Sequence, residues 1–139
     1  MKVNELRINN WYTSVKFGVP VQCELTDLSQ LCVMSDGAYN DPPIDEMFEP
    51  IELTEEWLLK FGFRQEEDHG KKINWWNVPE ESNYKAHHLM EMQNAWTWFI
   101  DFDDCDVNND CHLITGFKYV HELQNLFFTL TGEELKIKP

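Results

Sequence analysis

Acidic side chains are concentrated in the segment 101–110, whose spacing comes closest to that of a cation site. Residues with side-chain oxygens stand at every second position here, beginning with Asp104 and Asp106, as they do in the first half of a calcium loop. The second half departs from that pattern, because Asn109 stands where such loops have glycine and Thr115 where they have glutamate. We therefore expect a solvated acidic loop. A metal-dependent enzyme or a cation-binding protein built on this cluster is the alternative.

The cysteines and histidines do not form a recognisable catalytic or zinc pattern. None of the four cysteines belongs to a C-x-x-C pair. Cys111 and His112 are adjacent, as are His87 and His88, and neighbours on an extended chain point to opposite faces. Cys23 lies in an apolar alternating run and is expected in the core. The sequence therefore predicts no catalytic residue, no metal ligand and no cofactor.

Six tryptophans raise the question of a stacking platform for bases or sugars. A nucleic-acid platform carries basic residues between its aromatics, whereas the region around Trp96 and Trp98 is acidic. Core packing is therefore the preferred interpretation. Trp75 or Trp76, if exposed, would instead anchor a protein interface.

The formal charge of −14 is segregated along the chain. Residues 17–59 contain ten acids and residues 86–117 contain six, and neither stretch contains Lys or Arg. The rest of the chain is close to neutral, so these stretches predict a surface that docks on a basic partner, or simply a solubilising one. The candidate partner-binding residues are Asp36, Asp41, Asp45, Glu46, Glu49, Glu52, Asp101, Asp103, Asp104, Asp106 and Asp110.

The acid excess disfavours direct binding to nucleic acid or to an anionic membrane, because both carry the same sign of charge. No apolar run approaches the roughly 18 residues that a membrane span needs. Residues 1–5 contain no apolar signal stretch, so we expect a mature protein in the cytoplasm of its cell.

Alternating residues predict two regions of antiparallel strands that would position these groups. The first alternates from Trp11 to Phe17 and again from Val19 to Leu25, with Leu31–Met34 as a short third strand. The second contains candidate strands at 73–78, 84–92 and 96–102, with Gln93-Asn94 as a turn between the last two.

Two helices are expected. In the first, at 53–62, Thr54 caps the start, Gly62 ends the helix, and Trp57, Leu58 and Phe61 form the buried stripe. The second spans about three to four turns before Gly132. Its apolar face contains Val120, Leu123, Leu126, Phe127 and Leu130, and its opposite, polar face contains His121, Glu122, Gln124 and Asn125.

Three segments carry a resemblance to a known family: NELRINNW at 4–11, LTEEWLLKFGF at 53–63 and YVHELQNLFFTLTGEEL at 119–135. Together they cover about a quarter of the chain and resemble small uncharacterised proteins encoded by phages and prophages of Bacteroidetes. Asn9 stands where that family usually has glycine. The resemblance implies a small accessory phage protein that acts inside a bacterium, with its function in the loops between the shared segments.

These observations predict a single α+β domain over residues 1–139. It would contain two small antiparallel β regions, as meanders or a barrel-like sheet, with a short middle helix and a longer final one. The expected function is non-enzymatic: binding to a basic, nucleic-acid-binding surface of a host protein, for example as an inhibitor of a CRISPR effector. A phage structural or assembly protein is the further alternative.

Overall fold

The computed structural model describes residues 6–34, 44–84, 87–100 and 112–139, and within these it leaves out the side chains of residues 31–34, 45–46 and 112–115. The first half of the chain contains β1 (Trp11–Ser14), β2 (Pro20–Gln22), α1 (Leu25–Met34), α2 (Ile44–Met47), β3 (Phe48–Glu49) and α3 (Glu55–Lys60). The second half contains β4 (Arg64–Asp68), β5 (Lys71–Asn77), β6 (His87–Met92), β7 (Ala95–Ile100), β8 (His112–Phe117) and α4 (Val120–Thr131).

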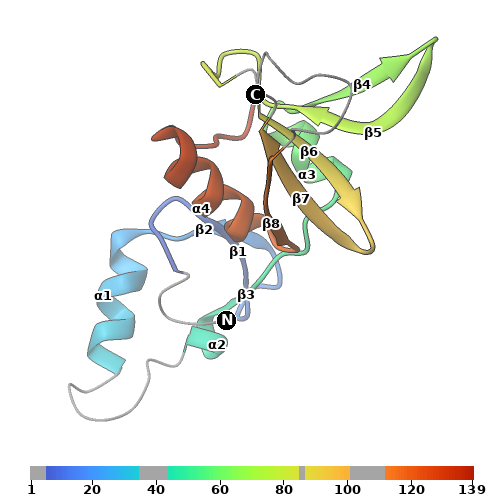
Figure 1. Ribbon diagram of the computed structural model, residues 1–139. Coiled ribbons are helices and arrows are strands. Elements are labelled where there is room, and N and C mark those ends of the chain that lie inside the picture. Colours follow the sequence, from blue (N-terminus) through green and yellow to red (C-terminus); the bar gives the residue numbers. More distant parts are fainter. Residues whose placement is uncertain (1–5, 35–43, 85–86, 101–111) are drawn as a thin grey trace.

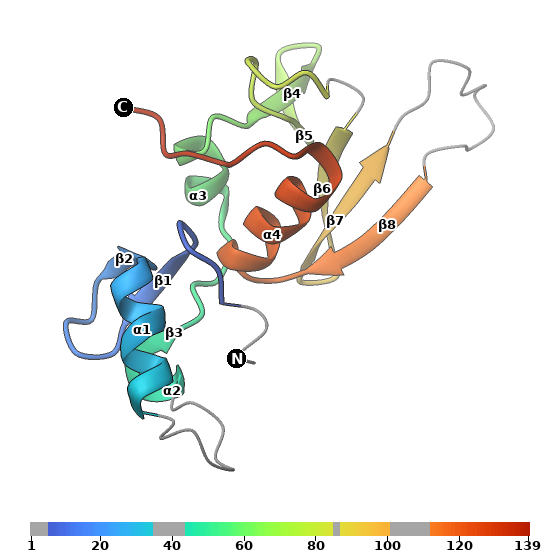
Figure 2. The same cartoon turned by 90° about the vertical axis from the view of Figure 1, so that its left-hand side faces the viewer.

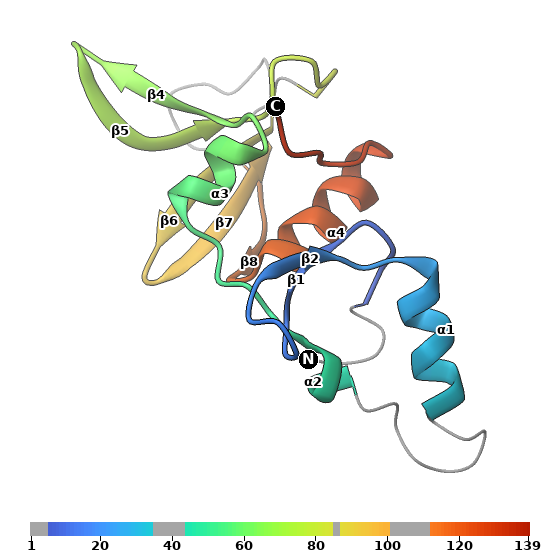
Figure 3. The ribbon, with the colours of Figure 1, turned by 180° about the vertical axis from the view of Figure 1, so that it is seen from behind.

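The described strands form two antiparallel sheets, which confirms the predicted α+β class (Figure 1). The smaller sheet has the order β2-β1-β3. The larger has the order β4-β5-β6-β7-β8, so each strand pairs with its neighbour in sequence and the sheet is an open meander. β5 pairs with β6 only through Trp76 and Asn77, and the β4–β5 hairpin extends away from the rest of the sheet (Figures 1 and 3).

The main core lies between α4 and one face of the five-stranded sheet (Figure 2). Strand periodicity turns Trp76, Leu89 and Trp98 toward this core, and helical periodicity turns Leu123 and Phe127 toward it from α4. These side chains are almost completely buried, and Trp96 is buried in the same cluster, so the interpretation of Trp96 and Trp98 as core residues is confirmed. Trp76 is buried as well, and therefore cannot be an exposed interface anchor.

A second, smaller cluster holds together the part of the chain that we call the N-terminal lobe, which comprises β1, β2, α1, α2 and β3. Its buried members are Tyr12, Cys23 and Phe48, with Leu28 and Met47 packed against them. The prediction that Cys23 is a core residue is confirmed. In Figure 2 the lobe lies beside α4 and apart from the five-stranded sheet.

The ends of the two predicted helices are confirmed. The backbone N–H of Trp57 donates to Thr54 Oγ1 at 3.5 Å at the start of α3, and Gly62 follows its end with a φ of 86°. α4 ends at Gly132, whose φ of 71° is in the left-handed region. The predicted turn at Gln93-Asn94 is also present, since both residues have a positive φ and Met92 pairs with Ala95.

Several sequence predictions of secondary structure were wrong. Leu31–Met34 is not a strand but the last turn of α1, because a short apolar run is compatible with either structure. The strand that begins at Trp11 ends at Ser14, and Phe17 lies in the following turn. β4 and β8 were not predicted. β4 is polar throughout, with four charged residues of five, and β8 follows the acidic segment 101–110.

The polar face of α4 is not exposed as its sequence predicts, because it packs on the N-terminal segment. Gln124 is completely buried; its Oε1 accepts from the Trp11 N–H at 2.8 Å and its Nε2 donates to the Asn9 carbonyl at 3.1 Å. His121 is also buried, with its ring 5.2 Å from that of Tyr12 and 5.9 Å from that of Tyr119. Hydrogen bonding to a chain segment distant in sequence overrides the polar pattern here.

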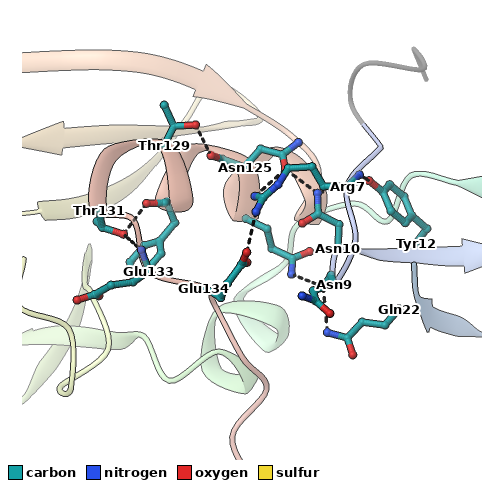
Figure 4. Close-up of polar contacts among 12 residues, drawn as sticks. Arg7, Asn9, Asn10, Tyr12, Gln22, Asn125, Thr129, Thr131, Glu133 and Glu134 are labelled. Atoms are coloured by element: carbon teal, nitrogen blue, oxygen red, sulfur yellow. Dashed lines mark hydrogen bonds and ion pairs between the residues drawn. The ribbon is translucent and has the colours of Figure 1, made fainter. Parts of the chain in front are cut away.

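We call this contact region the junction; Figure 4 shows its polar side chains. Asn125 Oδ1 accepts from Asn10 Nδ2 at 2.6 Å and from Arg7 Nη1 at 3.3 Å, while Arg7 Nη2 pairs with Glu134 Oε1 at 2.7 Å. Asn9, which has a φ of 72°, makes the turn that brings these groups together. The junction therefore joins the N-terminal lobe to α4 through hydrogen bonds as well as apolar packing.

Candidate protein-interaction surface

Most of the acidic residues predicted to bind a partner lie outside the described residues. Of those in the described part, Glu49 and Glu52 are exposed, and Asp45 and Glu46 lie on α2 without described side chains. The residues outside the description are Asp36, Asp41, Asp101, Asp103, Asp104, Asp106 and Asp110.

The calcium-like segment 104–109 and Cys111 also lie outside the described residues. Within the described part of the chain, no group of three or more His, Cys, Asp and Glu side chains is placed to hold a metal ion. His87 and His88 point to opposite faces of β6, as predicted: His87 is buried, whereas His88 is half-buried and lies 4.7 Å from the ring of Trp75.

The most exposed large apolar side chains of the described residues lie in the N-terminal lobe. Phe17 is 67% exposed and Leu25 is 66% exposed, and Val15 and Val19 are also exposed. The tight turn after β1 explains the position of Phe17: Gly18 N donates to Ser14 O at 2.7 Å, and Ser14 N donates to Val19 O at 2.9 Å. Val15, Phe17 and Val19 all lie in the short connection between β1 and β2, and exposed apolar side chains clustered in this way are typical of interaction sites.

Phe17 lines a cavity of about 560 Å³, which we call the N-terminal groove. Its apolar wall includes Phe17, Val21 and Met47. Phe48, a member of the smaller core cluster, also lines it. Two carboxylates, Glu24 and Asp27, line it from the start of α1. The remaining lining residues are Ser14, Lys16, Gln22 and Gln30.

A local hydrogen bond fixes the position of one of the two carboxylates at this groove. The backbone N–H of Glu24 donates to Asp27 Oδ2 at 2.8 Å, which fixes the Asp27 carboxylate at the start of the helix. Burial, together with the charges of Asp27 and Glu24, raises the pKa of the nearby Cys23 thiol to about 11. Among the described residues that line the groove, Lys16 is the one cation, and its ammonium lies 5.1 Å from the centre of the Phe17 ring. The groove is therefore amphipathic and carries net negative charge.

Two further cavities, of about 450 Å³ and about 510 Å³, adjoin the C-terminal segment 133–139. The polar groups beside them mostly hold this segment in place: Glu133 Oε2 accepts from Ser82 at 2.9 Å, Glu134 pairs with Arg7, and Lys138 N donates to Lys60 O at 2.7 Å. Leu135, which lines both cavities, is buried in the main core. These cavities therefore belong to the structural attachment of the segment.

The predicted partner-binding residues include neither the carboxylates nor the apolar side chains that line the N-terminal groove. Phe17 was assigned to a strand, although Gly18 already signalled a turn at that point. Leu25 was assigned to the second strand rather than to the first turn of α1. Glu24 and Asp27 belong to the predicted acidic stretch, but only the fold shows that they line a groove with apolar residues.

No protein-family model, curated protein or solved structure matches this chain. The resemblance to phage proteins therefore stays a prediction. No helix among the described residues combines the length and the apolar character required to cross a bilayer.

Proposed function

We propose that the protein is a non-enzymatic binding module that docks on a basic surface of another protein through its N-terminal lobe. The observation that carries this proposal is the exposure of Phe17 and Leu25 beside Glu24 and Asp27, in a stretch of chain without Lys or Arg. Burial of the apolar side chains would supply affinity, and the carboxylates would select and attract a basic partner.

The specific partner that we propose is a nucleic-acid-binding protein of a bacterial host. Such proteins hold RNA or DNA in channels lined by Arg and Lys, and surface carboxylates can compete for those side chains. A phage accessory protein that acts in the host cytoplasm, such as an inhibitor of a CRISPR effector, fits both this chemistry and the phage-like segments of the sequence.

The test is a pull-down from a nuclease-treated Bacteroidetes lysate, followed by reconstitution with the purified captured protein. We expect the wild-type protein to bind a basic partner and the double variant Phe17→Ser, Leu25→Ser to bind it at least about tenfold more weakly. Leu59→Ser is the matched control, because Leu59 is 58% exposed on α3, outside the lobe.

The salt dependence of the reconstituted complex tests the electrostatic part of the proposal. Raising the salt concentration from about 0.05 M to about 0.5 M should weaken binding, because it screens exposed charges. An affinity that does not change with salt, or a partner without a basic surface, contradicts the proposal. Equal loss of binding in the Leu59→Ser control would show that the lobe is not the docking site.

A further inference from the structure

The N-terminal groove is large enough to admit a long side chain together with part of the segment that carries it. Its volume of about 560 Å³ exceeds that of any single amino-acid side chain, and it opens beside the exposed Phe17 ring. One part of its wall is apolar and another carries carboxylates, so a ligand that fills it must be amphipathic as well.

We propose that the groove binds a lysine or arginine side chain from an exposed segment of the partner in which basic and apolar residues alternate. This inference rests on the proposed function and assigns its recognition element. The aliphatic stem of the basic side chain would pack on Val21 and Met47, and its cationic head would reach Glu24 and Asp27.

The carboxylates determine the sign of the ligand's charge. Glu24 is exposed, and Asp27 is half-buried with one of its oxygens held by the Glu24 N–H. A carboxylate pair beside apolar walls attracts a cation more strongly than it would in open water, since the local dielectric is lower. Lys16 lies at the Phe17 side of the groove, so the cationic head is expected to be drawn to the α1 side.

The exposed apolar side chains determine what accompanies the basic residue. Phe17 and Leu25 each leave about two thirds of their surface in solvent, and Leu25 directly follows Glu24 in the chain. Apolar residues on either side of the partner's basic residue would cover them. Because an extended segment presents neighbouring residues on opposite faces, we propose that the partner's segment bends at the groove, so that its basic residue and the adjacent apolar residues face the same surface.

The test uses two peptide probes in solution with the intact protein. The first, Gly-Leu-Arg-Leu-Arg-Leu-Gly, contains both features, and the second replaces each Leu by Ser while keeping the charge. Binding is followed by two-dimensional NMR of backbone amides. We expect the first peptide to shift the amides of the groove residues and to bind at least about tenfold more tightly than the second.

Two variants test the groove without removing a core residue. Glu24→Gln with Asp27→Asn neutralises the carboxylates, and Gln30→Trp places a large ring at an exposed lining position without changing the charge. Each should weaken binding of the first peptide by about tenfold or more. The controls are Glu67→Gln with Asp68→Asn on β4, and Ser29→Trp on α1, which is exposed but does not line the groove.

The outcomes separate this inference from the proposed function. The inference is overturned if the first peptide does not bind, or if it binds both groove variants as tightly as the wild-type protein. If the purified partner still binds the protein in a salt-dependent way and Gln30→Trp leaves that binding unchanged, the groove assignment is wrong while the docking function stands. If magnesium or calcium chloride alone shifts the same amides and displaces the peptide, the groove is a cation site and the inference is wrong.

Discussion

The indole nitrogen of Trp98 donates a hydrogen bond to Nδ1 of His87 at 3.0 Å, between adjacent strands of the five-stranded sheet. Both side chains are buried. Because Nδ1 must accept this hydrogen bond, the His87 ring is neutral and carries its proton on Nε2. Protonation of Nδ1 would place two donors against each other in the sheet, so the bond links the protonation state of His87 to the stability of the fold.

This arrangement predicts that stability falls in mild acid. Burial, and then the neighbouring His88, lower the pKa of His87 below 6.5 in the folded protein, whereas the unfolded chain keeps its ordinary value. The unfolded state therefore binds the proton first, and the free energy of unfolding decreases as the pH falls from about 7 through the range below about 6.5.

The measurement is urea unfolding at a series of pH values for the wild-type protein and for His87→Gln. Glutamine keeps an acceptor for Trp98 and does not titrate, so its curve should depend less on pH between about 5 and 7. Identical pH dependence in the two proteins would show that His87 does not contribute.

A second prediction concerns the junction. Gln124→Leu removes the acceptor of the Trp11 N–H and the donor to the Asn9 carbonyl, without a large change in side-chain volume. Because an unsatisfied buried backbone group costs about 1–3 kcal/mol, we expect the free energy of unfolding to fall by about 2 kcal/mol. Thr129→Ala on the exposed side of α4 serves as the control. A loss no larger than that of the control would mean that the hydrogen bonds at Gln124 do not stabilise the junction.

Two neighbouring phenylalanines of α4 provide a third prediction. Phe127 is 2% exposed and lies in the main core, whereas Phe128 is 39% exposed. The guanidinium carbon of Arg7 lies 4.1 Å from the centre of the Phe128 ring. Phe127→Ala should cost about 3–5 kcal/mol through the cavity that it creates. Phe128→Ala loses an exposed cation–π contact and should cost about 0.5–1 kcal/mol. Chemical denaturation of the two variants measures the difference in their free energies of unfolding. Equal losses would contradict an α4 that turns Phe127 toward the core and Phe128 toward solvent.

The start of α3 provides a fourth prediction. Thr54→Ala removes the oxygen that accepts the Trp57 N–H, and we expect a loss of about 0.5–1 kcal/mol, since the 3.5 Å distance is long for a cap. Thr54→Ser keeps the acceptor and should stay close to wild type. The midpoint of thermal unfolding measures both, and a Ser variant as unstable as the Ala variant would show that the threonine methyl group, rather than the cap, is what matters.

The sequence was most informative where local signals agreed. α3 has a cap, a stop and an apolar stripe within ten residues of chain, and α4 has a longer stripe that ends at a glycine. α1 was misassigned because Leu31–Met34, taken alone, is apolar without a decisive period. β4 was missed because all its residues are polar and most are charged, and its place in the sheet depends on pairing with β5 rather than on burial.

The candidate site could be predicted only in part. The absence of Lys and Arg between Lys16 and Lys60 is a property of the sequence, and it pointed to this region of the chain. The groove depends on tertiary structure, since Phe17 comes from the turn after β1, Asp27 from α1 and Met47 from α2. The same holds for His121 and Gln124, because a polar helix face gives no local sign that a distant segment will bury it.

The junction also has a consequence for the order of folding. Trp11 N and Gln124 Oε1 are 113 positions apart in the chain, and Asn10 and Asn125 are 115 apart. Each pair of adjacent strands in the five-stranded meander, by contrast, is close in sequence and can form early. Closing so large a loop carries a high entropic cost, so β1 is expected to dock only after α4 has been synthesised and has settled on the sheet. During synthesis on the ribosome, the N-terminal lobe would therefore be the first part made and the last to be anchored.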